Sequence, residues 1–265
     1  MQAQTEVMDA PIAFVTDEVA AAFAGEKSSH RVMIDEDSAF KLSVIEKENP
    51  ADIKNQRVEG DTIYFDFDFD MHLKSGETVS TIGVKTPFGG IGSHLWVQEE
   101  HRPVGWDFDC GEATLEYKDG KRHTHSVQTE EEFELNPNDD YLIAICEELL
   151  KREVPIKNER FLLEIPTHLP YWRTATEMPK FASRLGFEIV GMRIERLNLL
   201  SMTDDDIKAE GADHYTVSGL VADRRIGFYQ TLFLRHWDAK TPSCTWGENP
   251  WVCVLELKKI DLNYY

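Results

Sequence analysis

The chain has 265 residues and a formal net charge of −20 at pH 7. Its hydrophobic fraction of 42% is enough for a folded core, which excludes an intrinsically disordered protein. Proteins that bind extended duplexes usually collect Lys and Arg against the phosphates, so the acidity disfavours that function. A local basic pocket for a nucleoside or a short single strand needs only a few cations, so this function is compatible with the net negative charge.

The cysteines and the hydropathy indicate a reducing, cytoplasmic setting. The four cysteines are spread along the chain without a C-x-x-C pair. The start MQAQTEVMDAP lacks the basic and apolar regions of a signal peptide, and no apolar run approaches the roughly 18 residues of a membrane span. We therefore expect a soluble protein without a membrane partner.

Residues 1–10 are expected to form a flexible leader, and the Ala-rich segment after Pro11 is expected to form a helix that stops at Gly25. Directly after this stop, the polar cluster Lys27-Ser28-Ser29-His30-Arg31 enters the apolar run VMI. The pattern places the cluster at a junction between a helix and a strand.

The run TIYFDFDFDMHL, which begins at Thr62, alternates apolar and acidic side chains and predicts a strand, with a hairpin to the run TVSTIGV. Its outer face carries Asp66, Asp68 and Asp70. Three carboxylates in a row could hold a cation such as calcium, but a solvated face is the favoured interpretation because no glycine loop or bidentate partner accompanies them.

The middle of the chain, residues 105–140, is acidic and rich in turn residues, and it precedes the predicted helix YLIAICEELLKREV. His123 and His125 would share a strand face and could join Cys110 or His168 around zinc. No second close pair of ligands follows, so we expect no metal site and no cofactor.

In the last third, FEIVGMRIERLNLL is expected to be a long strand and WVCVLELKKI the final one. Between them, TDDDIKAEG predicts a short helix with Thr203 as its N-cap and Gly211 as its stop.

These residues resemble the ASCH domain family, in the form common among bacteriophage proteins. The match in the C-terminal third is carried by Met178-Pro179-Lys180-Phe181-Ala182-Ser183-Arg184, Arg193, Arg196-Leu197, Thr203-Asp204-Asp205-Asp206, Ala209-Glu210-Gly211, Trp237-Asp238 and Asn249-Pro250-Trp251. In the N-terminal half, Ala24-Gly25-Glu26-Lys27-Ser28 resembles the family's G-x-K-T element, and Pro87-Phe88-Gly89 and Leu95-Trp96-Val97 resemble its turn and following strand.

The resemblance implies an α+β fold: a PUA-like β-barrel with flanking short helices. It would form one domain over residues 11–265 with two insertions, a β-hairpin at about 36–84 and an acidic loop plus helix at about 105–165.

The resemblance also implies a cleft. Some ASCH proteins are similar to small amidohydrolases that deacetylate acetylcytidine with a lysine, a threonine and a glutamate. Lys27 and Glu210 match the lysine and the glutamate, and the threonine position falls on His30. The missing hydroxyl could come from Ser28 or Ser29, and the histidine would then act as a base.

Five further residues are candidates for ligand binding: Arg31, Glu99, Arg184, Asn249 and Trp251. Trp251 could stack on a base or pack in the core, and Arg184 could contact a phosphate or pair with an acidic neighbour. Where the phage form typically reads Arg-Glu-Thr-Trp, this chain has Gln98-Glu99-Glu100-His101, which keeps the glutamate but loses a cation and a ring.

Three functions remain open at this point. The leading one is recognition of a nucleoside or of short single-stranded RNA or DNA, in the host cytoplasm if a phage encodes the chain. The second is an amidohydrolase that acts on an acylated nucleobase such as acetylcytidine. The third is an acidic interaction protein that targets a host protein through the face of Asp66, Asp68 and Asp70.

Overall fold

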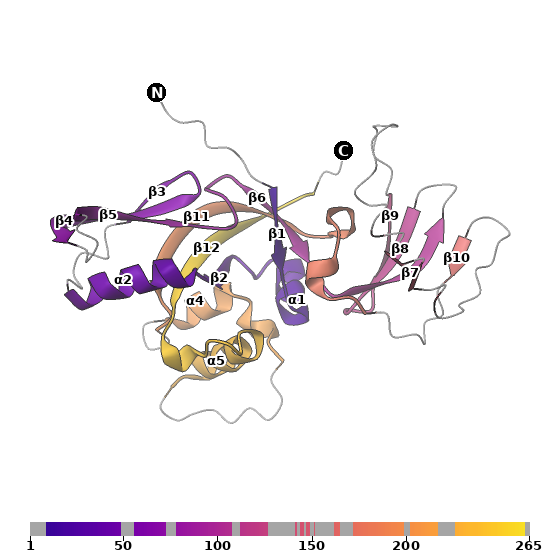
Figure 1. Ribbon diagram of the computed structural model, residues 1–265. Coiled ribbons are helices and arrows are strands. Elements are labelled where there is room, and N and C mark those ends of the chain that lie inside the picture. Colours follow the sequence, from indigo (N-terminus) through magenta and orange to yellow (C-terminus); the bar gives the residue numbers. More distant parts are fainter. Residues whose placement is uncertain are drawn as a thin grey trace, which may run out of the picture. The chain divides into compact units, whose positions relative to one another are not determined.

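The computed structural model describes residues 9–48, 56–72, 78–107, 112–126, 141, 144–145, 147–148, 151, 162–164, 172–198, 202–216 and 226–262; of residues 48, 67–72, 79, 106 and 162–164 it describes the backbone alone. The chain is a mixed α+β protein in which sheets predominate (Figure 1). The described strands form sheets of five, four and three strands, and no closed barrel is found among them. The α+β class is therefore confirmed, and the PUA-like barrel stays a prediction.

The chain divides into two compact units. The first comprises Met1–Ala10, Ala20–Leu95 and Gly186–Ile260, and the second comprises Pro11–Val19, Trp96–Leu185 and Asp261–Tyr265. Three of the five boundaries between them fall inside strands β1 (Asp9–Ala13) and β6 (His94–Gln98) and inside helix α1 (Thr16–Ala24). The expected single domain with two insertions stays a prediction.

The five-stranded sheet has the strand order β1-β6-β11-β12-β2. In the first unit, β12 (Trp251–Ile260) pairs antiparallel with β11 (Gly186–Arg196) on one side and with β2 (Ser29–Met33) on the other. Residues 251–255 of β12 are buried at every position. A run of apolar residues without alternation is what a strand covered on both faces requires.

One face of β12 is covered by α4 (Asp204–Ala209) and α5 (Phe228–Lys240), which lie together in Figure 1. The short 3-10 segments Ala212–His214 and Trp246–Glu248 follow them. The shared core consists of Leu197, Met202, Ile207, Ala212, Tyr215, Phe233, Trp237, Val252 and Val254.

The predicted short helix after Thr203 is confirmed. The Thr203 hydroxyl accepts the backbone N–H of Asp206, and the Asp206 carboxylate accepts from Thr203 in return, which is a capping box. Gly211 ends the helix in a left-handed conformation at φ 93°.

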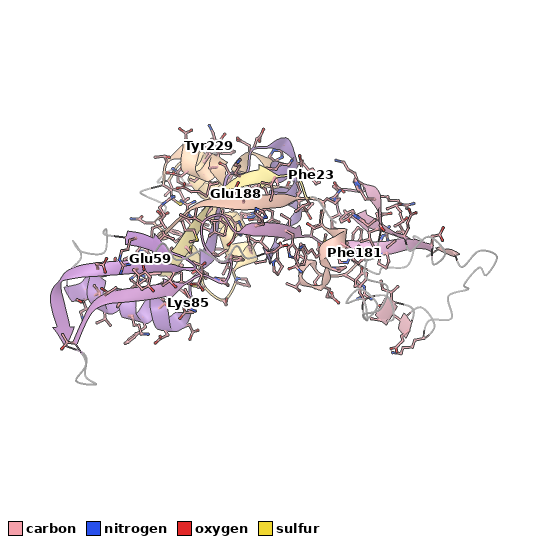
Figure 2. All side chains as sticks on the ribbon, turned by 90° about the horizontal axis from the view of Figure 1, so that it is seen from above. Phe23, Glu59, Lys85, Phe181, Glu188 and Tyr229 are labelled. Carbon is pink, nitrogen blue, oxygen red and sulfur yellow. The ribbon has the colours of Figure 1, made fainter. Side chains whose placement is uncertain are left out.

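The predicted hairpin is also confirmed, within a three-stranded sheet of β3 (Gln56–Glu59), β4 (Thr62–His72) and β5 (Thr78–Lys85). Figure 2 labels Glu59 and Lys85 on its two outer strands. Ile63 and Phe65 are fully buried whereas Asp66 is partly exposed, as alternation requires. Helix α2 (Glu36–Glu48) belongs to the same unit.

The second unit holds a four-stranded antiparallel sheet in the order β10-β7-β8-β9. Its strands are β7 (His101–Asp107), β8 (Glu112–Tyr117), β9 (Arg122–Ser126) and β10 (Leu162–Glu164), and 3-10 segments follow at Ala175–Glu177 and Lys180–Ala182. The sequence suggested an acidic loop here, but EATLEY alternates strictly, and Gly120 at φ 78° makes the tight turn into β9. Of the described residues here, 105–107, 112–117, 122–126 and 162–164 therefore belong to strands.

His101 is a buried histidine in the second unit, with 0% of its surface exposed. Its Nδ1 lies 3.1 Å from the carbonyl oxygen of Glu99, and its Nε2 lies 2.8 Å from the Tyr141 hydroxyl. Because the carbonyl can only accept, Nδ1 carries the proton and Nε2 accepts from Tyr141. Burial lowers the pKa of His101 from 6.5 to about 4, so the ring is neutral at pH 7.

The second unit is therefore expected to lose stability between pH 6.5 and about pH 4. Over this range the unfolded chain protonates His101 at a pKa near 6.5 while the folded chain does not, so acidification favours unfolding, and the stability present above pH 6.5 is lost. Urea unfolding of the wild type and of His101→Gln at pH 7 and pH 5 checks this. The variant should show the smaller loss, and an equal loss in both proteins would contradict the role of His101.

Candidate active site

Strand β2 and the residue pair before it present Lys27, Ser29 and Arg31 on one face. Alternate residues of an extended segment share a face, so Ser28 and His30 lie on the other. Lys27, Ser29 and Arg31 are buried, whereas Ser28 is exposed. Ser28 is fixed through its backbone instead: its N–H donates to the carbonyl of Ala209 at 2.8 Å and its carbonyl accepts from Leu257 at 2.8 Å. These bonds tie β2 to the end of α4 and to β12.

Glu210 faces this surface from the C-terminal cap of α4. Its backbone carbonyl accepts from Lys27 Nζ at 2.9 Å and from the Tyr215 hydroxyl at 3.0 Å. The next residue must be glycine, because a Cβ on Gly211 would lie 2.5 Å from the Cβ of Ala21. The turn after α4 therefore sets the position of the glutamate.

The Glu210 carboxylate gathers three donors. Oε1 accepts from Ser29 Oγ at 3.0 Å and from Arg31 Nη1 at 2.7 Å, and Oε2 lies 3.5 Å from Lys27 Nζ. The side chains of Lys27, Arg31 and Glu210 are 0%, 2% and 3% exposed. We call these four residues, Lys27, Ser29, Arg31 and Glu210, the Glu210 cluster. A buried charge is costly unless it is paired, and here two cations surround one carboxylate.

A second carboxylate balances the excess cation. Glu195 on β11 accepts from Arg31 Nε at 3.3 Å and from Nη2 at 3.0 Å. Burial would lower the pKa of Arg31, but Glu210 and Glu195 together hold it above its ordinary value. The guanidinium is therefore a fixed positive charge that joins the cluster to β11.

His30 takes no part in the Glu210 cluster. It lies on the opposite face of β2, buried, with its Nε2 3.4 Å from Lys240 Nζ on α5. His30, which the resemblance placed at the threonine position, is thus not the group that meets the glutamate. The adjacent residue, Ser29, supplies the hydroxyl.

Trp251 is packed in the core of the first unit and is 4% exposed. Its Nε1 donates to the Ser43 hydroxyl of α2 at 3.1 Å, and the Arg196 guanidinium lies 4.4 Å from the ring centroid. Of the two interpretations of this residue, core packing matches the geometry. Asn249 is exposed in a left-handed conformation at φ 49°, and its carbonyl accepts from Arg196 at 2.9 Å.

Glu99 and Arg184 belong to the second unit and pair with each other. Arg184 donates from Nε to Oε1 at 2.9 Å and from Nη2 to Oε2 at 2.5 Å, and its Nη1 reaches Asp119 at 3.1 Å. Its guanidinium also lies 3.7 Å from the centroid of the Tyr117 ring. Arg184 thus has the acidic partners that the sequence offered as the alternative to phosphate.

No group of three or more His, Cys, Asp or Glu that could hold a metal occurs in the described part of the chain. His123 and His125 do share a face of β9, where His125 Nε2 lies 2.7 Å from the Tyr117 hydroxyl. Their suggested partners Cys110 and His168 lie outside the described residues.

The acidic strand face is described only at Asp66, because the side chains of Asp68 and Asp70 lie outside the described residues. The Asp66 carboxylate accepts from Arg57 Nε at 2.7 Å and from Thr81 Oγ1 at 2.7 Å. The interaction with a host protein through this face stays a prediction.

Sequence reasoning missed Glu195 and Tyr215. The signal for Glu195 was its place two residues after Arg193 on the long predicted strand, which puts both on one face. Tyr215 carried no such signal, because its contact with Glu210 depends on the turn at Gly211.

Comparison of this chain with family models, with curated proteins and with solved structures finds no match. Among the described residues, no helix has the length and apolar character that crossing a bilayer demands.

Proposed function

We propose that the first unit recognises an acylated nucleobase or nucleoside, such as acetylcytidine, and hydrolyses its amide bond. The observation that carries the proposal is the convergence of Lys27 and the Ser29 hydroxyl on the Glu210 carboxylate, at 3.5 Å and 3.0 Å. A lysine, a hydroxyl and a glutamate are also what the resemblance to ASCH amidohydrolases implies.

Ser29 is the nucleophile in this proposal and Glu210 is its base. The 3.0 Å hydrogen bond from Ser29 Oγ to Glu210 Oε1 is within the range that proton transfer needs. Oγ bonds to the amide carbonyl carbon while Glu210 takes the hydroxyl proton. The C–N bond then breaks, and the proton passes to the leaving exocyclic amine. Water cleaves the resulting acyl-serine ester, which releases the carboxylic acid and restores Ser29.

Lys27 supplies the positive charge next to the reacting atoms. Its ammonium group is fixed by the Glu210 carbonyl at 2.9 Å and is buried, so its field is little screened. Negative charge that develops on the carbonyl oxygen during attack is stabilised by such a preorganised donor. Arg31 holds the carboxylate in place from the other side.

Recognition without turnover is the second candidate, and the depth of the Glu210 cluster favours it. The side chains of Lys27 and Glu210 are 0% and 3% exposed, and attack by Ser29 requires the substrate carbonyl to reach them. A ligand could instead be bound at the surface above an intact charge network.

Incubation of the purified protein with acetylcytidine, followed by chromatography, separates these candidates. The wild type is expected to release cytidine and acetate. Lys27→Ala should lose at least about 100-fold in kcat/KM, as loss of one preorganised donor does. Lys258→Ala, which removes an exposed lysine from β12, is the matched control and should keep full activity.

The outcomes point in different directions. Saturable binding of acetylcytidine without product would establish recognition in place of hydrolysis. Turnover that survives in folded Lys27→Ala would show that Lys27 has no role in catalysis. Neither binding nor turnover at high protein concentration would overturn the proposed function.

A further inference from the structure

An alternating row of charges links the Glu210 cluster to exposed side chains. From Arg31 the row continues to Glu195, then to Arg193, whose Nε donates to Glu195 at 3.0 Å, and then to Glu256, which accepts from Arg193 Nη1 at 3.0 Å. The side chains of Glu195, Arg193 and Glu256 are 32%, 38% and 54% exposed. These partly exposed groups form the outer part of the row that begins at the buried cluster.

A third carboxylate, Asp206, interacts with the same row of charges. The Thr203 hydrogen bonds are the main cause of its lowered pKa, and the guanidinium charges of Arg31 and Arg193 lower it further, which places the carboxylate near both. We call Arg193, Glu195, Asp206 and Glu256 the anionic rim. The cluster and the rim together hold four carboxylates (Glu195, Glu210, Asp206 and Glu256) and three cations (Lys27, Arg31 and Arg193), so their net charge by count is −1.

The strand register places this rim next to the nucleophile. Ser29 of β2, Glu256 of β12 and Gly191 of β11 are cross-strand neighbours, so they lie in one row on one face. A Cβ on Gly191 would lie 2.4 Å from Glu256 Oε2, so the carboxylate leans over the glycine and away from Ser29. The bare Gly191 therefore leaves room for the Glu256 carboxylate in the same row as Ser29.

We propose that the anionic rim makes the site selective for uncharged nucleosides and free bases and rejects the corresponding nucleotides. This inference rests on the proposed function and names its substrate class. A phosphate monoester brings up to two negative charges, and it would meet carboxylates whose cations are already paired. The chain's net charge of −20 adds repulsion of the same sign at longer range.

The test compares kcat/KM for acetylcytidine and for its 5′-monophosphate at low and at high ionic strength. The nucleoside should be favoured by about tenfold at low ionic strength, and the preference should shrink as salt screens the rim. Glu195→Gln and Glu256→Gln should each raise turnover of the nucleotide relative to the nucleoside. Glu256 lies two ion pairs further from Arg31 than Glu195 does, so its variant tests the rim with the Glu210 cluster left intact.

Glu188→Gln is the matched control. Glu188 lies on β11, where Figure 2 labels it, and its side chain is 32% exposed, as is that of Glu195. This variant removes the same charge away from the rim and should leave the preference unchanged.

Equal turnover of nucleoside and nucleotide would overturn the rim proposal and leave the proposed function standing. A preference that neither rim variant reduces, or that Glu188→Gln reduces equally, would overturn it too. If neither compound is turned over and both bind, the ratio of their dissociation constants gives the same comparison. If neither binds, the proposed function itself fails.

Discussion

Glu210→Ala is expected to lower the free energy of unfolding of the first unit by about 3–5 kcal/mol. The carboxylate is the common partner of Lys27 and Arg31, whose side chains are 0% and 2% exposed. Removal of one member of a buried ion pair leaves the opposite charges without compensation in a medium that solvates them poorly. Lys27 keeps its bond to the backbone carbonyl of residue 210, but a neutral carbonyl does not offset a full charge.

Hydrogen exchange in β2 and β12 measures this effect where it arises, because both strands belong to the first unit. Glu195→Ala is the control, since its side chain is 32% exposed and water can replace the lost contact. Its cost should stay near 1 kcal/mol. A loss below 1 kcal/mol in Glu210→Ala would mean that the cluster is not the electrostatic centre of the unit.

Local chemistry explains which parts of this structure are predictable from the sequence. Thr203 and Asp206 form a capping box within one turn, and Gly211 ends the helix because it adopts φ 93° without strain. The hairpin strand follows from alternation alone, with Ile63 and Phe65 buried. Each of these features needs only neighbours in the sequence.

Only the resemblance predicted that Lys27 and Glu210 lie in one site, because 183 residues separate them. Which of the two serines, Ser28 or Ser29, meets Glu210 could not be predicted from the sequence. It depends on which face of β2 turns toward α4, and a shift of one residue would exchange the two hydroxyls. In the structure, Ser29 of β2 pairs with Glu256 of β12, and this pairing defines the register.

Trp251 and Arg184 show the same limit. A tryptophan after Asn249-Pro250 is the type of residue that stacks on a base, yet Trp251 contacts Ser43 of α2 and Arg196. An arginine is the type of residue that contacts phosphate, yet the guanidinium of Arg184 donates to Glu99 and Asp119. Tertiary contacts from distant segments decided both cases.

Ser29→Ala is expected to reduce turnover of acetylcytidine by at least about 10³-fold, while Ser28→Ala leaves it unchanged. The two serines are adjacent, but only the Ser29 hydroxyl donates to Glu210, at 3.0 Å, and Ser28 is exposed on the opposite face. Loss of one hydrogen bond costs about 1 kcal/mol, so the Ser29 variant should still fold. Ser29→Thr keeps the hydroxyl and should recover part of the activity.

Chromatographic assay of the three variants, with circular dichroism to check folding, decides between three mechanisms. Activity lost in Ser28→Ala and kept in Ser29→Ala would reverse the assignment of the hydroxyl. Activity kept in both would make water the nucleophile, with Glu210 as the base that activates it, because the carboxylate retains Lys27 and Arg31 as partners in either variant. Trapping of an acyl-enzyme by rapid quench in the wild type, and its absence from Ser29→Ala, would identify the covalent route through Ser29.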